Sequence, residues 1–252
     1  TGLCADRCPV GINTGSLIKK LRSDKYQRFV PIARWSADHF AGVTRTARGA
    51  LGLRGIAGKL LGDKALAGLV NGVRNVSGQR TPAWLPTLPG PSRYQWPPGE
   101  GSHSGSSERA VVYLPSCASR VFGQQEDAPS LPDVVQSLLN KAGCRVIVPV
   151  RVEGLCCGMP YDSKGMVEVA QAKRSELAEA LWQASEQGRW PVLLDTSPCV
   201  QRLLSGALGK DLRVFEPATF VLEHLLPHLE LTPIDETVML HITCSSRRMG
   251  LG

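Results

Sequence analysis

The chain has 252 residues, of which 42% are hydrophobic and 20% charged, and its formal net charge is +7. These proportions fit a folded globular protein with a substantial core and exclude an intrinsically disordered chain. No apolar run reaches the ~18–20 residues that a transmembrane helix needs, and no signal-peptide pattern opens the sequence.

A cysteine motif comes first. Cys4 and Cys8 are separated by three residues, and Pro9 follows the second cysteine. A Cys–Pro pair that closes such a run is typical of bacterial ferredoxins, in which thiolates hold a 4Fe–4S cluster. Two thiolates cannot hold four irons, so we expect the other ligands to precede Thr1 and residues 1–29 to be the end of a ferredoxin-type module. A zinc-site remnant, or thiols without a role, is the alternative.

Helices are expected after this motif. Thr14 or Ser16 is the expected N-cap of the first helix, in which Leu17, Ile18 and Leu21 recur on one face. Residues 30–80 are rich in Ala, Leu and Arg with scattered glycines, and this composition predicts a basic segment of short helices broken at glycine.

The positive charge is concentrated near the start of the chain. Residues 16–80 contain thirteen Lys and Arg but only three Asp and no Glu. Such a surplus favours anionic lipid, nucleic acid or an acidic partner domain, although a solvated helical face is the simpler interpretation. Residues 81–108 are dense in Pro, Gly and Ser, and predict a linker or an extended strap.

Strands and helices alternate in residues 109–233. The apolar runs predict strands within 110–117, 144–150 and 191–199, and helices over 133–143, with Gly143 as C-cap, and over 163–188, 200–208 and 218–226. This alternation predicts an α/β fold in which helices cover a parallel sheet. In such folds, functional sites form at the carboxyl ends of the strands.

Two stretches of the sequence match without a gap. Residues 111–123 (VVYLPSCASRVFG) and 238–250 (VMLHITCSSRRMG) lie 127 positions apart. The identical pairs are Val111/Val238, Cys117/Cys244, Ser119/Ser246, Arg120/Arg247 and Gly123/Gly250. The match predicts tandem copies of one unit of about 125 residues, with 109–233 as the first copy and 234–252 as the start of a truncated second. We therefore expect the chain to be an internal fragment.

The chain contains eight cysteines. In a small secreted protein they would predict disulfides, but this chain is large, two of them are adjacent, and several have the spacing of metal ligands. Reduced cytosolic thiols that bind metal are the better interpretation. Cys144 enters a predicted strand and is expected to be a buried apolar residue instead.

Four cysteines of the first copy form the strongest candidate site. Cys117 and Cys199 end predicted strands, and the adjacent pair Cys156 and Cys157 lies in the loop after another. A parallel sheet brings these positions to one edge, where thiolates can hold a soft metal. Gly158, which follows the pair, is expected to let the backbone crowd a bound cluster.

The pattern Cys…Cys-Cys-Gly…Cys, partly duplicated and preceded by a ferredoxin-like motif, resembles the cysteine-rich CCG domain. That domain occurs in heterodisulfide reductase subunits, glycolate oxidase iron–sulfur subunits and related electron-transfer proteins. The stretch CADRCPVGINTG, the basic helix after it and TSPC at 196–199 are more similar still to the C-terminal half of bacterial D-lactate dehydrogenases that use FAD and iron–sulfur clusters. The resemblance is strong over 1–22 and 109–202 and weak over 30–108.

The resemblance implies two sets of metal ligands and the start of a third. These are Cys4 and Cys8 for a 4Fe–4S cluster, Cys117, Cys156, Cys157 and Cys199 for the CCG centre, and Cys244 for a second CCG centre. The family pattern ends in Cys-x-x-Cys, whereas Arg202 stands where the last cysteine would be. A centre of different nuclearity, zinc, or a site shared with a second module therefore stays open.

The family implies that this chain is the electron-transfer portion of a D-2-hydroxyacid dehydrogenase, and that the full-length enzyme acts on D-lactate. Electrons would pass from FAD on a preceding N-terminal part toward a quinone or cytochrome. Arg120 and Arg247 would raise the potential of an anionic centre, or else only cap the strand edges. The chain alone is not expected to oxidise lactate, because no GxGxxG follows a predicted strand.

The implied partners are the chain's own flavin domain, the electron acceptor and an anionic membrane surface, with no nucleic acid. The expected location is the cytoplasm, or the inner face of the cytoplasmic membrane. Two alternatives stay open. One is an iron–sulfur subunit of the glycolate oxidase or heterodisulfide reductase type, and the other is a non-catalytic scaffold whose cysteines bind structural zinc and which docks a redox partner.

Overall fold

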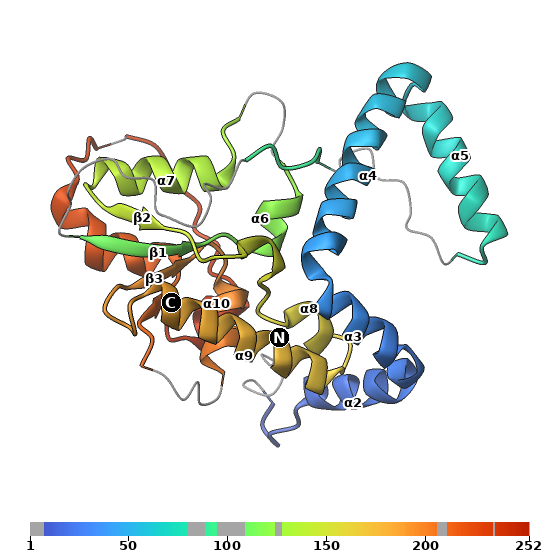
Figure 1. The fold of residues 1–252 in the computed structure, drawn as a ribbon, viewed down its shortest axis with the longest axis horizontal. Coiled ribbons are helices and arrows are strands. Elements are labelled where there is room, and N and C mark those ends of the chain that lie inside the picture. The colour runs from blue at the N-terminus through green and yellow to red at the C-terminus, as the bar shows by residue number, and fades with distance from the viewer. Residues whose placement is uncertain are drawn as a thin grey trace.

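The computed structural model describes residues 8–79, 89–94, 109–123, 128–205, 211–233 and 235–251, so Cys4 lies outside the described residues. A parallel sheet flanked by helices is joined to a helical segment, which ends in a projecting hairpin (Figure 1). The predicted α/β class with a parallel sheet is confirmed. No helix in the described ranges is long and apolar enough to cross a membrane.

The sheet has four parallel strands in the order β2-β1-β3-β4. The strands are β1 (Ala110–Leu114), β2 (Arg145–Ile147), β3 (Val192–Leu194) and β4 (Val214–Phe215). Every residue of β1 and β3 is buried, because helices cover both faces of the sheet, and such strands are continuous apolar runs in the sequence. The sequence did not predict β4, since two residues show no periodicity.

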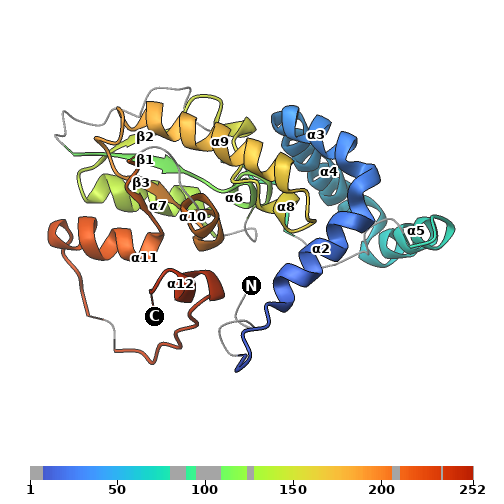
Figure 2. The ribbon, with the colours of Figure 1, turned by 90° about the horizontal axis from the view of Figure 1, so that it is seen from below.

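Helices connect the strands and cover the sheet, with α9 along one face and α7 along the other (Figure 2). The bounds are α6 (Cys117–Val121), α7 (Leu131–Lys141), η2 (Val152–Gly154), α8 (Met159–Asp162), α9 (Val167–Ala184), α10 (Ser197–Leu204), α11 (Pro217–Phe220), η3 (Val221–Leu225), η4 (Leu226–His228) and α12 (Cys244–Arg248). Gly143 follows α7 with a φ of 70°, as expected for a residue that ends a helix.

The N-terminal segment is helical throughout its described part. Its elements are α2 (Thr14–Tyr26), η1 (Gln27–Phe29), α3 (Val30–Asp38), α4 (Phe40–Leu61) and α5 (Asp63–Val76). The N-cap of α2 is Asn13, whose side chain accepts a hydrogen bond from the Ser16 amide at 3.1 Å, so the predicted cap at Thr14 or Ser16 is wrong. No residue of α2 is buried, and its predicted apolar face is exposed.

The prediction of short helices broken at glycine holds only at Gly62, between α4 and α5, and is wrong at the other glycines of α4. α4 runs for 22 residues through Gly42, Gly49 and Gly52, and the chain turns only at Gly62, which has a φ of 77°. A glycine inside a helix costs about 1 kcal/mol relative to alanine, and the surrounding Ala, Leu and Arg are strong helix formers that offset this cost. α4 ends only at Gly62, where the backbone takes a positive φ.

The second copy of the repeat resembles the first at its helix cap. Ser116 and Thr243 both have extended N-cap backbones, with φ/ψ of −63°/159° and −67°/156°, and the side chain of each accepts a hydrogen bond from the amide three residues on. If 234–252 starts a second copy, a strand equivalent to β1 is expected before Thr243, but the described residues show none there, and Val238 and Leu240 are exposed. A strand needs a neighbouring strand to pair with, and none of the four strands in the described sheet pairs with this segment.

The described part of the Pro/Gly/Ser-rich segment, residues 89–94, is held against the sheet domain. Pro91 forms an antiparallel bridge with Phe122, and the Gly123 amide donates to the Gly90 carbonyl at 2.8 Å. A Cβ at Gly123 would lie 2.6 Å from the Pro91 carbonyl oxygen. This stretch is therefore a strap, the second of the two predicted alternatives.

Candidate metal centre

The strand order creates a crevice between β1 and β3. From β1 the chain goes to β2 on one side, and it then returns to β3 on the other side of β1. The carboxyl ends of two strands on either side of such a reversal form the usual site of α/β folds. Cys117 begins α6, which follows β1 after Pro115 and Ser116, and Cys199 lies in the first turn of α10 after β3.

Hydrogen bonds hold these two strand ends together. The Ser116 hydroxyl accepts from the Ser119 amide at 3.2 Å and so caps α6. The Ser116 amide donates to the carboxylate of Asp195 at 2.8 Å, and Tyr113 donates to the same carboxylate at 3.4 Å. Burial raises the pKa of Asp195, which follows β3 directly. These contacts place the segments that carry Cys117 and Cys199 next to each other.

The loop between η2 and α8 brings in the adjacent cysteines. Gly158 has a φ of 82°, and a Cβ there would lie 2.2 Å from the backbone oxygen of Ala170 on α9. The glycine is therefore required because the loop packs directly against α9. This differs from the prediction that Gly158 leaves room for a bound cluster.

Cys156 and Cys157 belong to different packed interiors. Cys157 belongs to the core cluster of the sheet, with Leu155 and Leu194, whereas Cys156 belongs to the cluster in which the helical segment packs against α8 and α9. Both cysteines are 3% exposed. The peptide bond between them therefore lies where the two interiors meet.

The four cysteines of the first copy line one small cavity. Its lining consists of Cys117, Cys156, Cys157, Cys199, Leu114, Pro115, Ser116, Arg120, Leu155 and Leu194. The cavity volume is about 10 Å³, which is room for about one water molecule or one ion. The Sγ atoms of Cys157 and Cys199 are 3.3 Å apart, and the Gly158 amide lies 3.4 Å from Sγ of Cys156.

A buried arginine lies beside these sulfurs. Arg120 is 3% exposed and lines the cavity, and its guanidinium donates to the carbonyls of Val152 and Leu155. Within the described ranges no ion pair joins it to a carboxylate. A guanidinium stays charged in proteins, and a buried charge needs a counter-charge nearby. The Asp195 carboxylate acts on Arg120 as a negative charge, and thiolates in the cavity would add to it.

The thiols share protons unequally. Hydrogen bonds from Cys117 and Cys157 lower the pKa of Cys156 to about 3, and the Gly158 amide and the charge of Arg120 act in the same direction. The bond to Cys156 raises the pKa of Cys117, and bonds to Cys156 and Cys199 raise that of Cys157. The bond to Cys157 lowers the pKa of Cys199. Before a metal binds, the cavity therefore favours thiolate at Cys156 and Cys199 and the protonated thiol at Cys117 and Cys157.

Thiols are the ligand type that a soft metal prefers, but the cavity has room for a single ion and its sulfurs are not spread into a cage, so an iron–sulfur cluster would need the three cysteine segments to move apart. In the described part of the chain, no group of three or more Cys, His, Asp or Glu side chains has the arrangement of a metal site. Four sulfurs around one zinc would lie about 3.8 Å apart, since each Zn–S bond is about 2.3 Å. The contact of 3.3 Å between Cys157 and Cys199 is shorter, so a bound ion would have to push these side chains apart by a few tenths of an ångström.

The other cysteines lie elsewhere. Cys8 is half-buried before α2, and neither Cys8 nor Cys244 is in the lining of the four-cysteine cavity. Cys244 begins α12 and lines a separate, larger cleft. Cys144 is buried in the sheet core, as predicted, and burial raises its pKa.

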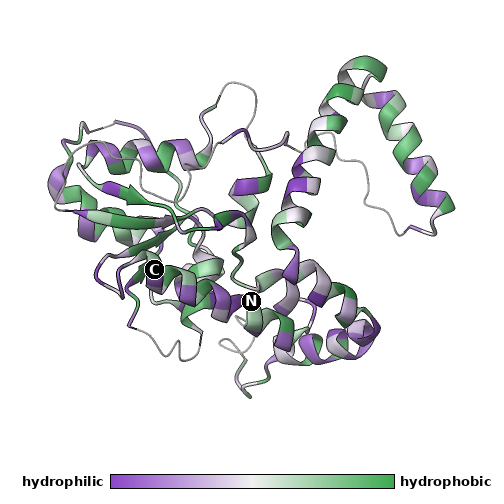
Figure 3. Cartoon of the chain, viewed as in Figure 1, coloured by the Kyte–Doolittle hydropathy of each residue, from purple (hydrophilic) through white to green (hydrophobic). Residues whose placement is uncertain are grey.

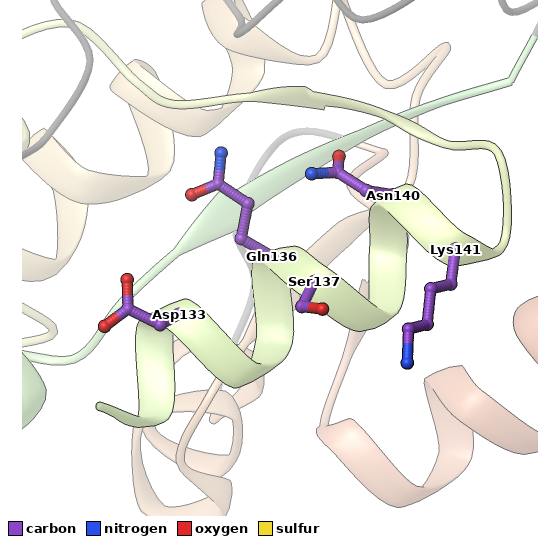
Figure 4. Close-up of a pocket in the computed structure, with 5 residues that line it drawn as sticks. All are labelled: Asp133, Gln136, Ser137, Asn140 and Lys141. Atoms are coloured by element: carbon purple, nitrogen blue, oxygen red, sulfur yellow. The ribbon is translucent and has the colours of Figure 1, made fainter. Parts of the chain in front are cut away.

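A third depression lies on the surface of α7. Its lining consists of polar side chains of this one helix: Asp133, Gln136, Ser137, Asn140 and Lys141 (Figure 4). None of them is a thiol, and a single helix face offers no second wall to enclose a ligand. The four-cysteine cavity is therefore the stronger candidate.

Sequence reasoning missed Asp195 and the reason for Gly158. Asp195 belongs to no motif, and Gly158 belongs to the Cys-Cys-Gly pattern, but the contacts of both become visible only in the folded chain, with Ser116 and with Ala170. Comparisons of the chain with protein-family models, with curated proteins and with solved structures find no match. The resemblance to CCG-domain proteins therefore remains a prediction.

Proposed function

We propose that Cys117, Cys156, Cys157 and Cys199 hold a redox metal centre, and that the chain is the iron–sulfur electron-transfer portion of a flavin-dependent D-2-hydroxyacid dehydrogenase, with D-lactate as the substrate of the whole enzyme. The observation that carries the metal centre is the convergence of four thiols from three separate segments on one ion-sized cavity beside a buried guanidinium. The family resemblance of the cysteine spacing supports the choice of iron–sulfur chemistry.

Structural thiols alone would not explain the arrangement. Buried free cysteines usually behave as small apolar residues, as Cys144 does. An apolar role gives no reason to place an arginine, which is costly to bury without a counter-charge, at the same cavity. Four thiols with an adjacent fixed cation form a set that favours anionic sulfur, and anionic sulfur is the form that binds metal.

The chain's own residues would hold and shield the centre. When bound, an iron–sulfur centre supplies one-electron transfer, and its potential depends on charge, burial and hydrogen bonds to sulfur. Arg120 places a positive charge beside the sulfurs and the Gly158 amide points to Cys156, and both favour the more negative, reduced state. Leu114, Leu155 and Leu194 exclude water from the cavity.

A zinc-binding docking scaffold is the second candidate. Arg202 stands where the family pattern has a further cysteine, so the described set has four thiols, the number that structural zinc needs. Anaerobic purification followed by analysis of iron, acid-labile sulfide and zinc separates the two functions. Iron with sulfide supports electron transfer, whereas zinc without sulfide supports the scaffold.

The decisive comparison uses two cysteine variants. Cys156→Ser should lose the metal that the four-cysteine cavity holds, while Cys144→Ala, which alters a buried thiol outside the cavity, should keep it. Because Cys4 and Cys8 could bind iron of their own, the quantity to compare is the difference between each variant and the unmodified chain. Equal metal content in Cys156→Ser and the unmodified chain would overturn the proposal.

The exposed surfaces suggest where partners bind. Leu17, Ile18 and Leu21 form an exposed apolar face on α2, and we assign this face to the flavin domain of the same protein. Electrons would continue from the centre to a quinone or cytochrome. These partners would place the protein in the cytoplasm, at the inner face of the membrane.

The projecting hairpin of α4 and α5 is the proposed membrane contact. Figure 3 shows apolar stretches along both helices, and the exposed apolar side chains are Leu53, Ile56, Leu60, Leu61, Leu69, Val73 and Val76. Residues 40–76 contain six Lys and Arg and one acidic residue. Apolar side chains together with excess positive charge match an anionic lipid surface, and no aromatic or polar pattern in the hairpin favours nucleic acid.

A further inference from the structure

A cleft bounded by four helices opens beside the four-cysteine cavity. Its volume is about 740 Å³, within the range of small-molecule sites. The first two turns of α2 line one side, and residues of α8, α10 and α12 line the others. Met159 and Pro198 belong to the lining, and they adjoin Gly158 and Cys199 in the sequence. The cleft therefore borders the loops that carry the thiols.

The charges of the lining are unbalanced. Four cationic side chains, Lys19, Arg22, Arg202 and Arg248, line the cleft together with one acidic side chain, Asp162. The described lining thus carries a net charge of +3, which is four positive charges less one. The hydroxyl groups of the lining can donate further hydrogen bonds, and they belong to Thr14, Ser16, Ser163, Ser205, Thr243 and Ser245.

The largely buried guanidinium of Arg202 makes few hydrogen bonds and ion pairs. Its side chain is 14% exposed, and its nearest contacts are long, at 3.5 Å to the Ser205 hydroxyl and 3.8 Å to the Asp162 carboxylate. Its buried Nε has no hydrogen-bond partner among the described residues. The pKa of nearby Arg174 is lowered by burial and then by the charge of Arg202, so the positive charge there is not fully compensated. A guanidinium presents five donors, and an oxyanion can accept two of them side by side.

Packing between helices explains two of the four cations. Lys19 pairs with Asp162, and Arg22 donates to the Ser163 carbonyl at 2.9 Å, so both hold α2 against α8. Neither contact accounts for Arg202, which projects from α10. A ligand in the cleft would accept hydrogen bonds from the guanidinium of Arg202.

We propose that this cleft binds a small organic molecule that carries two or more anionic oxygen groups, as a phosphate ester or a polycarboxylate does. Arg202 anchors one oxyanion through its fork of donors, and the positive charges of Lys19 and Arg248 attract the second. Met159 and Pro198 contact the uncharged part of the ligand. This inference goes beyond electron transfer and does not depend on it.

Isothermal titration calorimetry of the full chain at constant ionic strength tests the proposal, with pyrophosphate and citrate as separate probes. We expect saturable binding of at least one probe with one site per chain. Arg202→Gln should weaken this binding by about tenfold or more, and Arg202→Lys should have an intermediate effect because it keeps the charge but loses the fork. Arg189→Gln, which alters an exposed arginine paired with Glu186, is the matched control and should bind normally.

The outcomes are distinct. Preference for pyrophosphate identifies the ligand as a phosphate ester, and preference for citrate identifies it as a polycarboxylate. Binding that does not saturate, or that Arg202→Gln and Arg189→Gln weaken equally, would overturn the proposal. If circular dichroism shows that Arg202→Gln is unfolded, Lys19→Gln replaces it, and unchanged binding by that variant would count against the cleft.

Discussion

The backbone amide of Ser116 donates a 2.8 Å hydrogen bond to the buried carboxylate of Asp195. The two residues are 79 positions apart, and each precedes one of the segments that carry a cavity cysteine. This bond ties the end of β1 to the end of β3, so the spacing between Cys117 and Cys199 depends on it.

Asp195→Ala should destabilise the fold by about 1–3 kcal/mol, because it leaves the buried Ser116 amide without an acceptor. Asp195→Asn should lower the free energy of unfolding by less, since its amide oxygen can still accept the hydrogen bond from Ser116. Urea unfolding measures both differences, and Asp235→Ala, which alters an exposed carboxylate, is the control. Equal stability of the Ala and Asn variants would show that the Ser116 bond contributes nothing.

Arg120→Gln should raise the pH at which half of the protein is loaded with Co²⁺, by about one unit, because loss of the positive charge raises the pKa of the neighbouring thiols and metal binds thiolate. Thiolate-to-cobalt absorption measures this pH. Arg174→Gln is the control, since Arg174 is also buried and also donates to a backbone carbonyl, at 2.8 Å, but does not line the cavity. An equal shift in both variants would indicate a general loss of stability instead.

Gly158→Ala should destabilise the protein by about 1–3 kcal/mol, because alanine disfavours a positive φ and its Cβ would meet the Ala170 carbonyl. The loop with Cys156 and Cys157 would move, so metal content should fall as well. Gly154→Ala changes a glycine of the preceding turn whose added Cβ would meet nothing within 4 Å, and it should leave both unfolding and metal content unchanged. Normal metal content in Gly158→Ala would contradict the role given to this glycine.

Glu153→Gln should reduce stability at neutral pH by about 0.5–1 kcal/mol, because it removes the contacts of Arg45 and Arg48, at 2.8 and 2.6 Å, that hold α4 against η2. A hydrogen bond from Arg45 is the main cause that lowers the pKa of Glu153. The stabilisation is therefore complete above the ordinary pKa of 4.5 and is lost as the pH falls through the lowered value.

Urea unfolding of Glu153→Gln and of the unmodified chain, at neutral and acidic pH, measures the difference in their stability. Glu168→Gln, which breaks an exposed pair with Arg34, should change little at either pH and serves as the control. A difference between Glu153→Gln and the unmodified chain that persists at low pH would exclude the ion pair as its cause.

If the hairpin of α4 and α5 is the membrane contact, the protein should bind vesicles only when they contain anionic lipid. Replacing Leu69 and Val73 together by Asp should weaken cosedimentation with phosphatidylglycerol vesicles by more than about tenfold, since each added negative charge near an anionic surface costs about 1 kcal/mol. Both positions are exposed, so the fold should persist. Val167→Asp changes an equally exposed valine of α9 and should bind normally. Binding that is lost on charge reversal of Lys20 but not in the hairpin variant would place the contact on α2 instead.

The sequence predicted the parallel sheet and the convergence of four cysteines because both follow from local patterns and one topological rule. Apolar runs marked β1 and β3, and the carboxyl ends of parallel strands meet at one edge. The functional roles of those cysteines, and of Cys4, Cys8 and Cys244, remain predictions.

Other features could not be predicted because they depend on contacts between distant residues. The Asp195 carboxylate shows its role only when β1 and β3 pair, and the long α4 forms despite glycines that locally favour a break. The strand expected before Cys244 fails for the same reason, since strand formation depends on a neighbour and not on apolar residues alone.

The junction between Cys156 and Cys157 has a mechanical consequence. Cys156 packs in the cluster that joins the helical segment to α8 and α9, and Cys157 packs in the core of the sheet, so the two clusters meet at one peptide bond and a disturbance of one reaches the other. The pieces should therefore melt in a single cooperative transition. Expressed alone, residues 109–233 would keep all four cavity cysteines but would expose the apolar surface that the helical segment covers.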